Sequence, residues 1–99
     1  MSDEFKVKIT ATAREHLEEI RNDRDRIQRK ILSLSEAPYA RGKRLEDDLS
    51  HLHSVRAGRY RIIYVIRDQV HIVFVKAVGL RREGDRDDIY EIASRLYGE

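Results

Sequence analysis

The chain has 99 residues, of which 38% are charged and 40% are hydrophobic, and its formal net charge is +2 at pH 7. This length is typical of one domain, and the balance of charged and apolar residues indicates a folded globule and excludes a disordered chain. Cysteine is absent, which excludes disulfides, thiolate metal sites and cysteine nucleophiles and favours a reducing compartment. We therefore predict a single domain over residues 1–99.

Two further features of the sequence bear on location. Residues 1–4 (MSDE) are acidic, whereas a secretory signal peptide begins with a basic segment and continues with an apolar one. No apolar run approaches the ~20 residues that a helix needs to span a bilayer. We expect a cytoplasmic protein with no membrane partner.

The cationic residues are mostly arginine, with 15 arginines and 5 lysines. A guanidinium group matches phosphate geometry and stacks on bases, and the lysine ammonium does neither as well. Solvated ion pairs explain an arginine excess equally well, so the positions of the arginines have to decide between these interpretations.

The N-terminal part of the chain predicts a strand followed by a helix. Residues 5–9 alternate apolar and polar side chains, which is typical of a strand with one buried face. The period then changes to three and four residues. Thr12 and Glu15 have the spacing of a capping box, in which each side chain bonds a free amide of the first helical turn. We expect the helix to begin there.

The helical pattern continues as far as Leu34 and leaves two arrangements open. One long helix fits it, and so does a helical hairpin that turns at Asn22 and Asp23, because both residue types favour caps and turns. Helix formation should end before Pro38, since the residue before a proline is pushed out of the helical region.

The second half of the chain predicts an antiparallel meander. Residues 39–50 are polar and indicate a loop with room for one helical turn. Residues 60–66 and 70–78 are β-branched and aromatic runs, as in central strands that are buried on both faces. A short connection joins these two runs into a hairpin, and a shorter strand before them forms another, in which Gly58 is free to take a positive φ.

The chain closes with a charged loop and a helix at about residues 88–97. Asp87 and Asp88 stand at the positive end of that helix, where carboxylates are favourable. Its expected buried residues are Ile89, Ile92, Ala93 and Leu96. The predicted fold is therefore α+β: an N-terminal strand, a helical segment or helical hairpin, a three-stranded antiparallel meander and a C-terminal helix.

The stretch VRAGRYRIIY at residues 55–64 resembles the central hairpin signature of the RelE/ParE toxin superfamily, which commonly reads R-x-G-x-Y-R, two apolar residues and tyrosine. A leucine-bearing loop at residues 45–49 precedes it, as in that superfamily. Residues 75–79 lead into an arginine and then the apolar–tyrosine pair at residues 89–90. The resemblance covers nearly the whole chain in element order and implies a RelE-like domain.

The resemblance implies the toxin of a type II toxin-antitoxin system. Relatives of the RelE branch are ribosome-dependent endoribonucleases that cut mRNA and inhibit translation. They imply the ribosome, mRNA and a cognate antitoxin as partners, with no metal and no small-molecule cofactor. Members of the ParE branch poison DNA gyrase on the same fold, and a degenerate toxin that only binds its antitoxin is a third alternative. Fold analogy alone does not choose among them.

Metal-free RNA cleavage needs a base for the 2′-hydroxyl, cations around the phosphorane and an acid for the leaving oxygen. By resemblance, Arg61 contacts the scissile phosphate, Arg81 is the arginine after the last strand, and Tyr90 stacks on or orients the mRNA base. The loop before Tyr90 is longer than in the RNA-cutting relatives, so Arg82 is an alternative to Arg81. The expected contacts to the RNA backbone are three arginines: Arg56, Arg59 and Arg82.

Two lysines that the RNA-cutting type member carries before the hairpin are absent, and Leu52 and Ser54 stand at the matching positions. Neither can act as a base or a cation. His53 is the candidate base, because an unperturbed pKa of about 6.5 suits that role, although a histidine at a strand end is also an ordinary surface residue. His51 lies two residues earlier on the same predicted strand face. No third ligand is indicated, so we predict no metal site.

Overall fold

The computed structural model describes residues 4–98. Residues 1–3, and with them Asp3 of the acidic start, lie outside this range. Within it, no helix combines the length and the apolar character that crossing a membrane requires.

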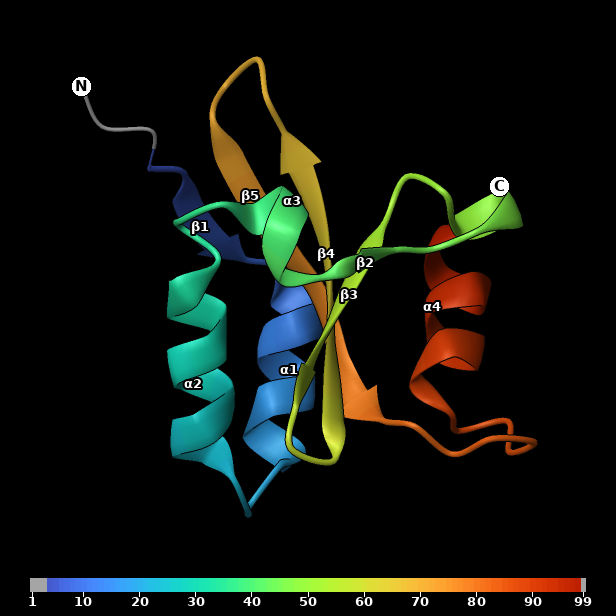
Figure 1. Cartoon of the computed structure of the whole chain (residues 1–99). Coiled ribbons are helices and arrows are strands. Elements are labelled where there is room, and N and C mark those ends of the chain that lie inside the picture. Colours follow the sequence, from blue (N-terminus) through green and yellow to red (C-terminus); the bar gives the residue numbers. More distant parts are fainter. Residues whose placement is uncertain (1–3, 99) are drawn as a thin grey trace.

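A five-stranded mixed sheet runs through the centre of the molecule, with the strand order β1-β5-β4-β3-β2 (Figure 1). Helices α1 and α2 cover one face of this sheet, and α4 lies against the other. In chain order the elements are β1 (Lys6–Ile9), α1 (Ala11–Glu19), α2 (Arg24–Ser33), α3 (Pro38–Arg41), β2 (Lys43–Arg44), the 3₁₀ turn η1 (Asp47–Leu49), β3 (His53–Ala57), β4 (Tyr60–Arg67), β5 (Ile72–Leu80) and α4 (Ile89–Tyr97).

The predicted meander is confirmed as β3, β4 and β5, which pair antiparallel in sequence order. Gly58 takes a φ of 61° in the turn between β3 and β4, a conformation that glycine adopts without strain. Strand β1 adds to β5 in parallel, and β2 adds to β3 in antiparallel orientation. Strand β1 is the predicted N-terminal strand, whereas the sequence did not predict β2.

The helical segment is a hairpin, which decides between the two arrangements. Helix α1 ends at Glu19 and α2 begins at Arg24, with Asp23 at a left-handed φ of 64° between them. The predicted helix start was wrong, because Thr10 and not Thr12 caps α1. The Thr10 hydroxyl accepts a bond from the amide of Ala13 (3.2 Å) and donates one to the carbonyl of Val75 (3.0 Å). This bond to β5 favours Thr10, which follows β1, as the N-cap residue of α1.

The region read as a loop holds three short elements, namely α3, β2 and η1. Helix α2 ends before Pro38, as predicted, and Pro38 then begins α3 at a position where its missing N–H costs nothing. Strand β2 has only two residues, and a strand this short carries no periodicity that a sequence pattern could reveal.

Helix α4 begins beside Asp88 and buries Ile89 and Ala93 completely. Leu96 was predicted to be buried but is 50% exposed. Tyr97 makes the contact with the sheet in its place, since its hydroxyl donates to the carbonyl of Lys76 (2.8 Å) and the Lys76 ammonium lies over its ring.

One buried side chain, Tyr64 of β4, fixes the position of α3 and β2. Tyr64 is completely buried, and its hydroxyl donates to the carbonyl of Pro38 at 2.8 Å. Burial raises the pKa of Tyr64 to about 12, so the hydroxyl keeps its proton. Gly42 lies directly against this hydroxyl, and a Cβ there would stand 2.7 Å from the carbonyl of Ser54. The chain therefore needs a residue without a side chain at position 42.

Replacing Tyr64 with phenylalanine should lower the free energy of unfolding by about 1–3 kcal/mol, because a buried carbonyl loses its hydrogen-bond donor. Urea denaturation at pH 7 measures this change. Tyr60→Phe is the matched control, since Tyr60 is also buried but its hydroxyl makes no hydrogen bond to any of residues 4–98. Equal unfolding midpoints for the two variants would contradict the role given to the Tyr64 hydroxyl.

Candidate functional site

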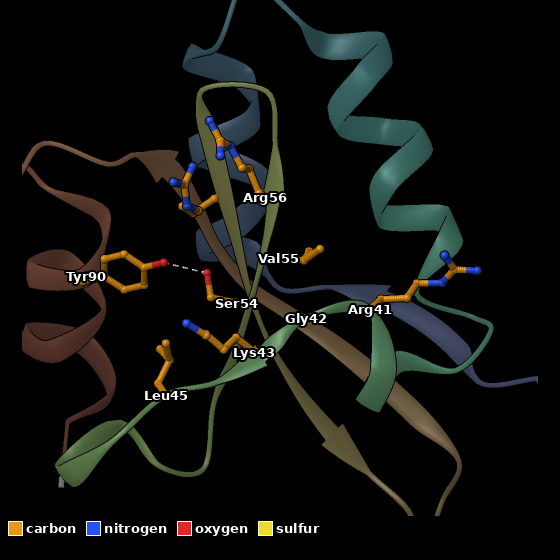
Figure 2. Close-up of a pocket in the computed structure, with 9 residues that line it drawn as sticks. Arg41, Gly42, Lys43, Leu45, Ser54, Val55, Arg56 and Tyr90 are labelled. Carbon is orange, nitrogen blue, oxygen red and sulfur yellow. Dashed lines mark hydrogen bonds between the residues drawn. The ribbon is translucent and has the colours of Figure 1, made fainter.

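A cavity of about 440 Å³ opens between β2, β3 and the first turn of α4 (Figure 2). Residues from α3, the two strands, the start of β4 and α4 line it: Arg41, Gly42, Lys43, Leu45, Ser54, Val55, Arg56, Arg61 and Tyr90. The volume is large enough for a phosphate group and part of the molecule to which that group is attached.

Strand register brings the polar side chains to one face. Lys43 pairs with Ser54 across β2 and β3, and Arg56 pairs with Arg61 across β3 and β4. Directly paired residues in an antiparallel ladder point to the same side, and so do residues two apart along one strand. Lys43, Ser54, Arg56 and Arg61 therefore share the face that α4 covers.

Three cations of this cavity, Lys43, Arg56 and Arg61, have no acidic partner among the described residues. Within the described residues no carboxylate lines it, and no ion pair within 4.0 Å involves Lys43, Arg56 or Arg61. Arg56 and Arg61 bond only carbonyl oxygens, those of Gly58 (3.2 Å) and Tyr60 (3.3 Å). Like charges placed opposite each other across two strands repel, so a bound anion would stabilise this arrangement.

Arg41 differs from the other cations of the lining. It extends away from Tyr90 in Figure 2 and is held by Glu36, with a bond from Nε to the backbone carbonyl (2.7 Å) and a contact with the carboxylate (3.6 Å). Arg41 therefore lies at the rim of the cavity.

Tyr90 closes the side of the cavity that faces α4. Its hydroxyl lies 2.9 Å from the hydroxyl of Ser54, and Figure 2 shows the two side chains pointing toward each other. The guanidinium of Arg81 lies over the Tyr90 ring, 4.9 Å from its centre, a geometry in which the ring face attracts the cation. Arg81 thus adjoins the cavity without lining it.

Asp88 positions both Arg81 and Tyr90. Its carboxylate is 2% exposed, caps α4 by accepting the amide of Tyr90 (3.1 Å), accepts the amide of Arg82, and pairs with Arg81 at 2.8 Å. Burial alone would raise the pKa of Asp88, but the bonds from Arg81 and from the amide of Arg82 outweigh it and hold that pKa below its ordinary value. The carboxylate therefore stays charged at neutral pH.

The predicted arginines and Tyr90 fall into three places. Arg56, Arg61 and Tyr90 line the cavity, and Arg81 stacks on its wall. Arg59 is exposed in the turn between β3 and β4. Arg82 lines a separate groove with residues of α1, among them His16 and Glu19. Of the two candidate arginines after the last strand, Arg81 is thus the one that contacts Tyr90.

The structure does not bring His53 together with Arg61. His53 is one residue before Ser54 in β3 and therefore points to the opposite face, where its ring stacks on Tyr64 at 5.5 Å. Its Nδ1 atom is buried and has no hydrogen-bond partner among the residues described. Burial, and secondly the charge of Arg44, lower the pKa of His53. His53 and His51 line a different cavity with Arg44.

Lys43 is the cavity residue that sequence reasoning missed. The two positions that match the missing lysines hold uncharged residues. Leu52 is completely buried, and the hydroxyl of Ser54 bonds that of Tyr90. Lys43 brings an ammonium group to the same place from the neighbouring strand, directly opposite Ser54. No periodic pattern marked Lys43, because β2 is two residues long.

Both the sequence and the fold are similar to those of known proteins. The family of ParE toxins of the type II parDE toxin-antitoxin systems matches residues 7–84. The chain is 36% identical over 92 residues to Toxin RelE of Mycobacterium tuberculosis, covering 82% of this chain and 88% of that protein.

Two solved structures are similar along most of the chain. The RelBE2 toxin-antitoxin complex of Mycobacterium tuberculosis matches with a TM-score of 0.67 and 31% identity, over 79% of this chain and 92% of the other. A variant of Escherichia coli toxin RelE in the free state matches with a TM-score of 0.72 and 19% identity, over 94% and 97%, which concerns the fold alone. The chain belongs to the RelE/ParE superfamily and is a toxin of a type II toxin-antitoxin system, which confirms the resemblance.

Replacing Asp88 with alanine should lower the free energy of unfolding by at least about 1 kcal/mol, the usual cost of losing a helix N-cap. It should also release Arg81 and loosen Tyr90, since Asp88 holds both. Urea denaturation gives the first effect, and the near-ultraviolet circular dichroism of the tyrosines gives the second. Asp87→Ala is the control, because Asp87 is exposed. If both variants behaved alike, the anchoring role of Asp88 would be refuted.

Proposed function

We propose that this toxin is a ribosome-dependent endoribonuclease that cleaves mRNA without a metal ion and thereby inhibits translation. The observation that carries this proposal is the cavity that Lys43, Arg56 and Arg61 line without an acidic partner among the described residues. Three cations around a space of this size suit a phosphodiester whose negative charge increases during cleavage.

In the proposed reaction the 2′-oxygen of the substrate attacks the adjacent phosphorus. A 2′-O–P bond forms while the P–O5′ bond breaks, which leaves a cyclic phosphate and a free 5′-hydroxyl. Arg61 and Arg56 hold the non-bridging oxygens, whose charge grows in the phosphorane. The ammonium of Lys43 supplies further positive charge and donates a proton to the departing 5′-oxygen.

The cavity offers no ordinary base for the 2′-hydroxyl. Among residues 4–98 neither an imidazole nor a carboxylate lines it. The proton of the 2′-hydroxyl therefore passes to solvent water. We assign most of the rate enhancement to positioning and to charge stabilisation, which need no proton acceptor from the protein. The Tyr90 ring, held by Arg81 and by the hydroxyl of Ser54, orients the base next to the scissile bond.

The exposed Arg59 continues this cationic surface past the turn between β3 and β4 and is proposed as an outer contact to the RNA backbone. Arg82 has no such role in this proposal, since its groove lies with α1. We also propose a cognate antitoxin, because the similar RelBE2 toxin of Mycobacterium tuberculosis is found in a toxin-antitoxin complex. Acidic side chains of such a partner would neutralise Lys43, Arg56 and Arg61.

Inhibition of DNA gyrase is the second candidate function. Two observations favour it: the matching family is that of the ParE toxins, and the described cavity lacks an imidazole or carboxylate base. In this case the same cations would bind an acidic surface or nucleic acid without cleaving it.

Mapping the 5′ ends of cellular mRNA after induced expression separates these functions. The toxin should produce breaks positioned by codon, and Arg61→Ala should reduce them roughly 100-fold, the usual effect of removing one group that stabilises an oxyanion. Lys43→Ala should reduce them at least about tenfold, as expected for a proton donor. Lys8→Ala, an exposed lysine on β1, is the matched control and should cut like the parent.

Each other outcome has a definite meaning. Intact mRNA together with broken chromosomal DNA would replace the nuclease with the gyrase inhibitor. Normal growth during expression would identify a degenerate toxin. Breaks that persist at full frequency in Arg61→Ala would show that the cavity is not the site of cleavage.

A further inference from the structure

A second cavity, of about 350 Å³, lies on the other side of β2. Five side chains define its chemistry: Tyr39, Arg44, His51, His53 and Arg67. Strand β2 separates it from the first cavity, because Lys43 pairs with Ser54 and the next residue, Arg44, pairs with His53. Alternation along β2 and β3 thus directs one cation of β2 to each cavity.

The second cavity is also cationic. Arg44 is oriented by a bond from its Nε to the carbonyl of Ser50 (2.7 Å). No ion pair within 4.0 Å joins Arg44 or Arg67 to a carboxylate in the described part of the chain. Asp68 follows Arg67 in the sequence and accepts a hydrogen bond from the Tyr39 hydroxyl. None of the residues described as lining the cavity is acidic.

The two histidines add ring N–H donors. The Nδ1 atoms of His51 and His53 are buried and have no partner among residues 4–98, and a buried N–H without an acceptor costs more than 1 kcal/mol by a rough estimate. In each ring Nε2 is therefore the nitrogen that carries a proton. Two Nε2–H donors beside two guanidinium groups favour an anion and disfavour a metal cation, which would need free lone pairs.

Tyr39 supplies an aromatic surface beside these donors. It is 53% exposed, and its ring stands edge-on to His53, with 5.8 Å between centres and 81° between planes. An exposed aromatic ring next to cations is the arrangement that binds a base together with its phosphate in proteins that hold single strands.

We propose that the second cavity binds one nucleotide of a single RNA strand, whose phosphate lies between Arg44 and Arg67 and accepts bonds from His51 and His53 while its base stacks on Tyr39. The strand crosses β2, the edge strand of the sheet, and continues to Lys43 and Arg61. This path rests on the proposed RNA target, whereas binding of a nucleotide to the second cavity does not.

The test follows the histidine and tyrosine side-chain signals of the labelled full-length protein by NMR, in an Arg61→Ala background that weakens the first cavity but keeps Lys43. The probes are adenosine 5′-monophosphate, adenosine and inorganic phosphate. The nucleotide should shift the signals of His51, His53 and Tyr39 and bind at least about tenfold more tightly than either fragment, since stacking and phosphate contacts add.

Variants assign the contacts. Arg44→Ala and Arg67→Ala should each weaken nucleotide binding roughly tenfold, the effect expected for one charged contact. Tyr39→Ala should weaken binding of the nucleotide but not of inorganic phosphate. Arg14→Ala, an exposed arginine on α1, is the control and should leave both unchanged.

Equal affinity for phosphate and nucleotide would mean that the second cavity binds an adventitious ion only, and would overturn the nucleotide site. Unchanged signals of His51 and His53 would overturn it as well. A short RNA oligonucleotide should bind more tightly than the nucleotide. Lys43→Ala should remove this gain in affinity and leave the affinity for the nucleotide unchanged. A gain that survives Lys43→Ala would overturn the path across β2. Because the background variant lacks Arg61, failure here is distinct from failure of mRNA cleavage, which the mapping of 5′ ends decides independently.

Discussion

The hydrogen bond from the Tyr64 hydroxyl to the carbonyl of Pro38 holds together the parts of this toxin that the sheet itself does not. It joins a central strand to a segment 26 residues earlier, and Gly42 allows the backbone to pass against it. Strand β2 is otherwise tied to β3 along its two residues and by the bond from the amide of Leu45 to the carbonyl of Leu52 (3.0 Å). The position of Lys43 and Arg44, and hence the charge of both cavities, depends on the Tyr64 hydrogen bond.

Both cavities follow from the same alternation along neighbouring strands. Lys43, Ser54, Arg56 and Arg61 reach the α4 side, whereas residues one step along the chain reach the side of the helical hairpin. The repulsion between Arg56 and Arg61 is a cost that the isolated toxin carries. Binding of any partner that neutralises these groups removes this cost. The proposed RNA substrate and an acidic segment of the proposed antitoxin would therefore compete for the same two arginines.

The fold was largely predictable from the sequence because its main elements have strong patterns. The runs at residues 60–66 and 70–78 identified the central strands, and the motif at residues 55–64 led to the family. Strand β2 was not predictable, since its place depends on a contact between distant residues. For the same reason Lys43 was missed. Thr10 replaced Thr12 as the cap because of its bond to Val75, which local spacing does not reveal.

The outermost strands have a consequence for solubility. β1 and β2 form the two edges of the sheet, where unpaired backbone groups invite pairing with another chain. Lys6 and Lys8 of β1 and both residues of β2 are exposed cations. Charge on a short edge strand opposes its pairing with the edge strand of another molecule. Lys43 and Arg44, which line the two cavities, therefore also protect the toxin against edge-to-edge aggregation.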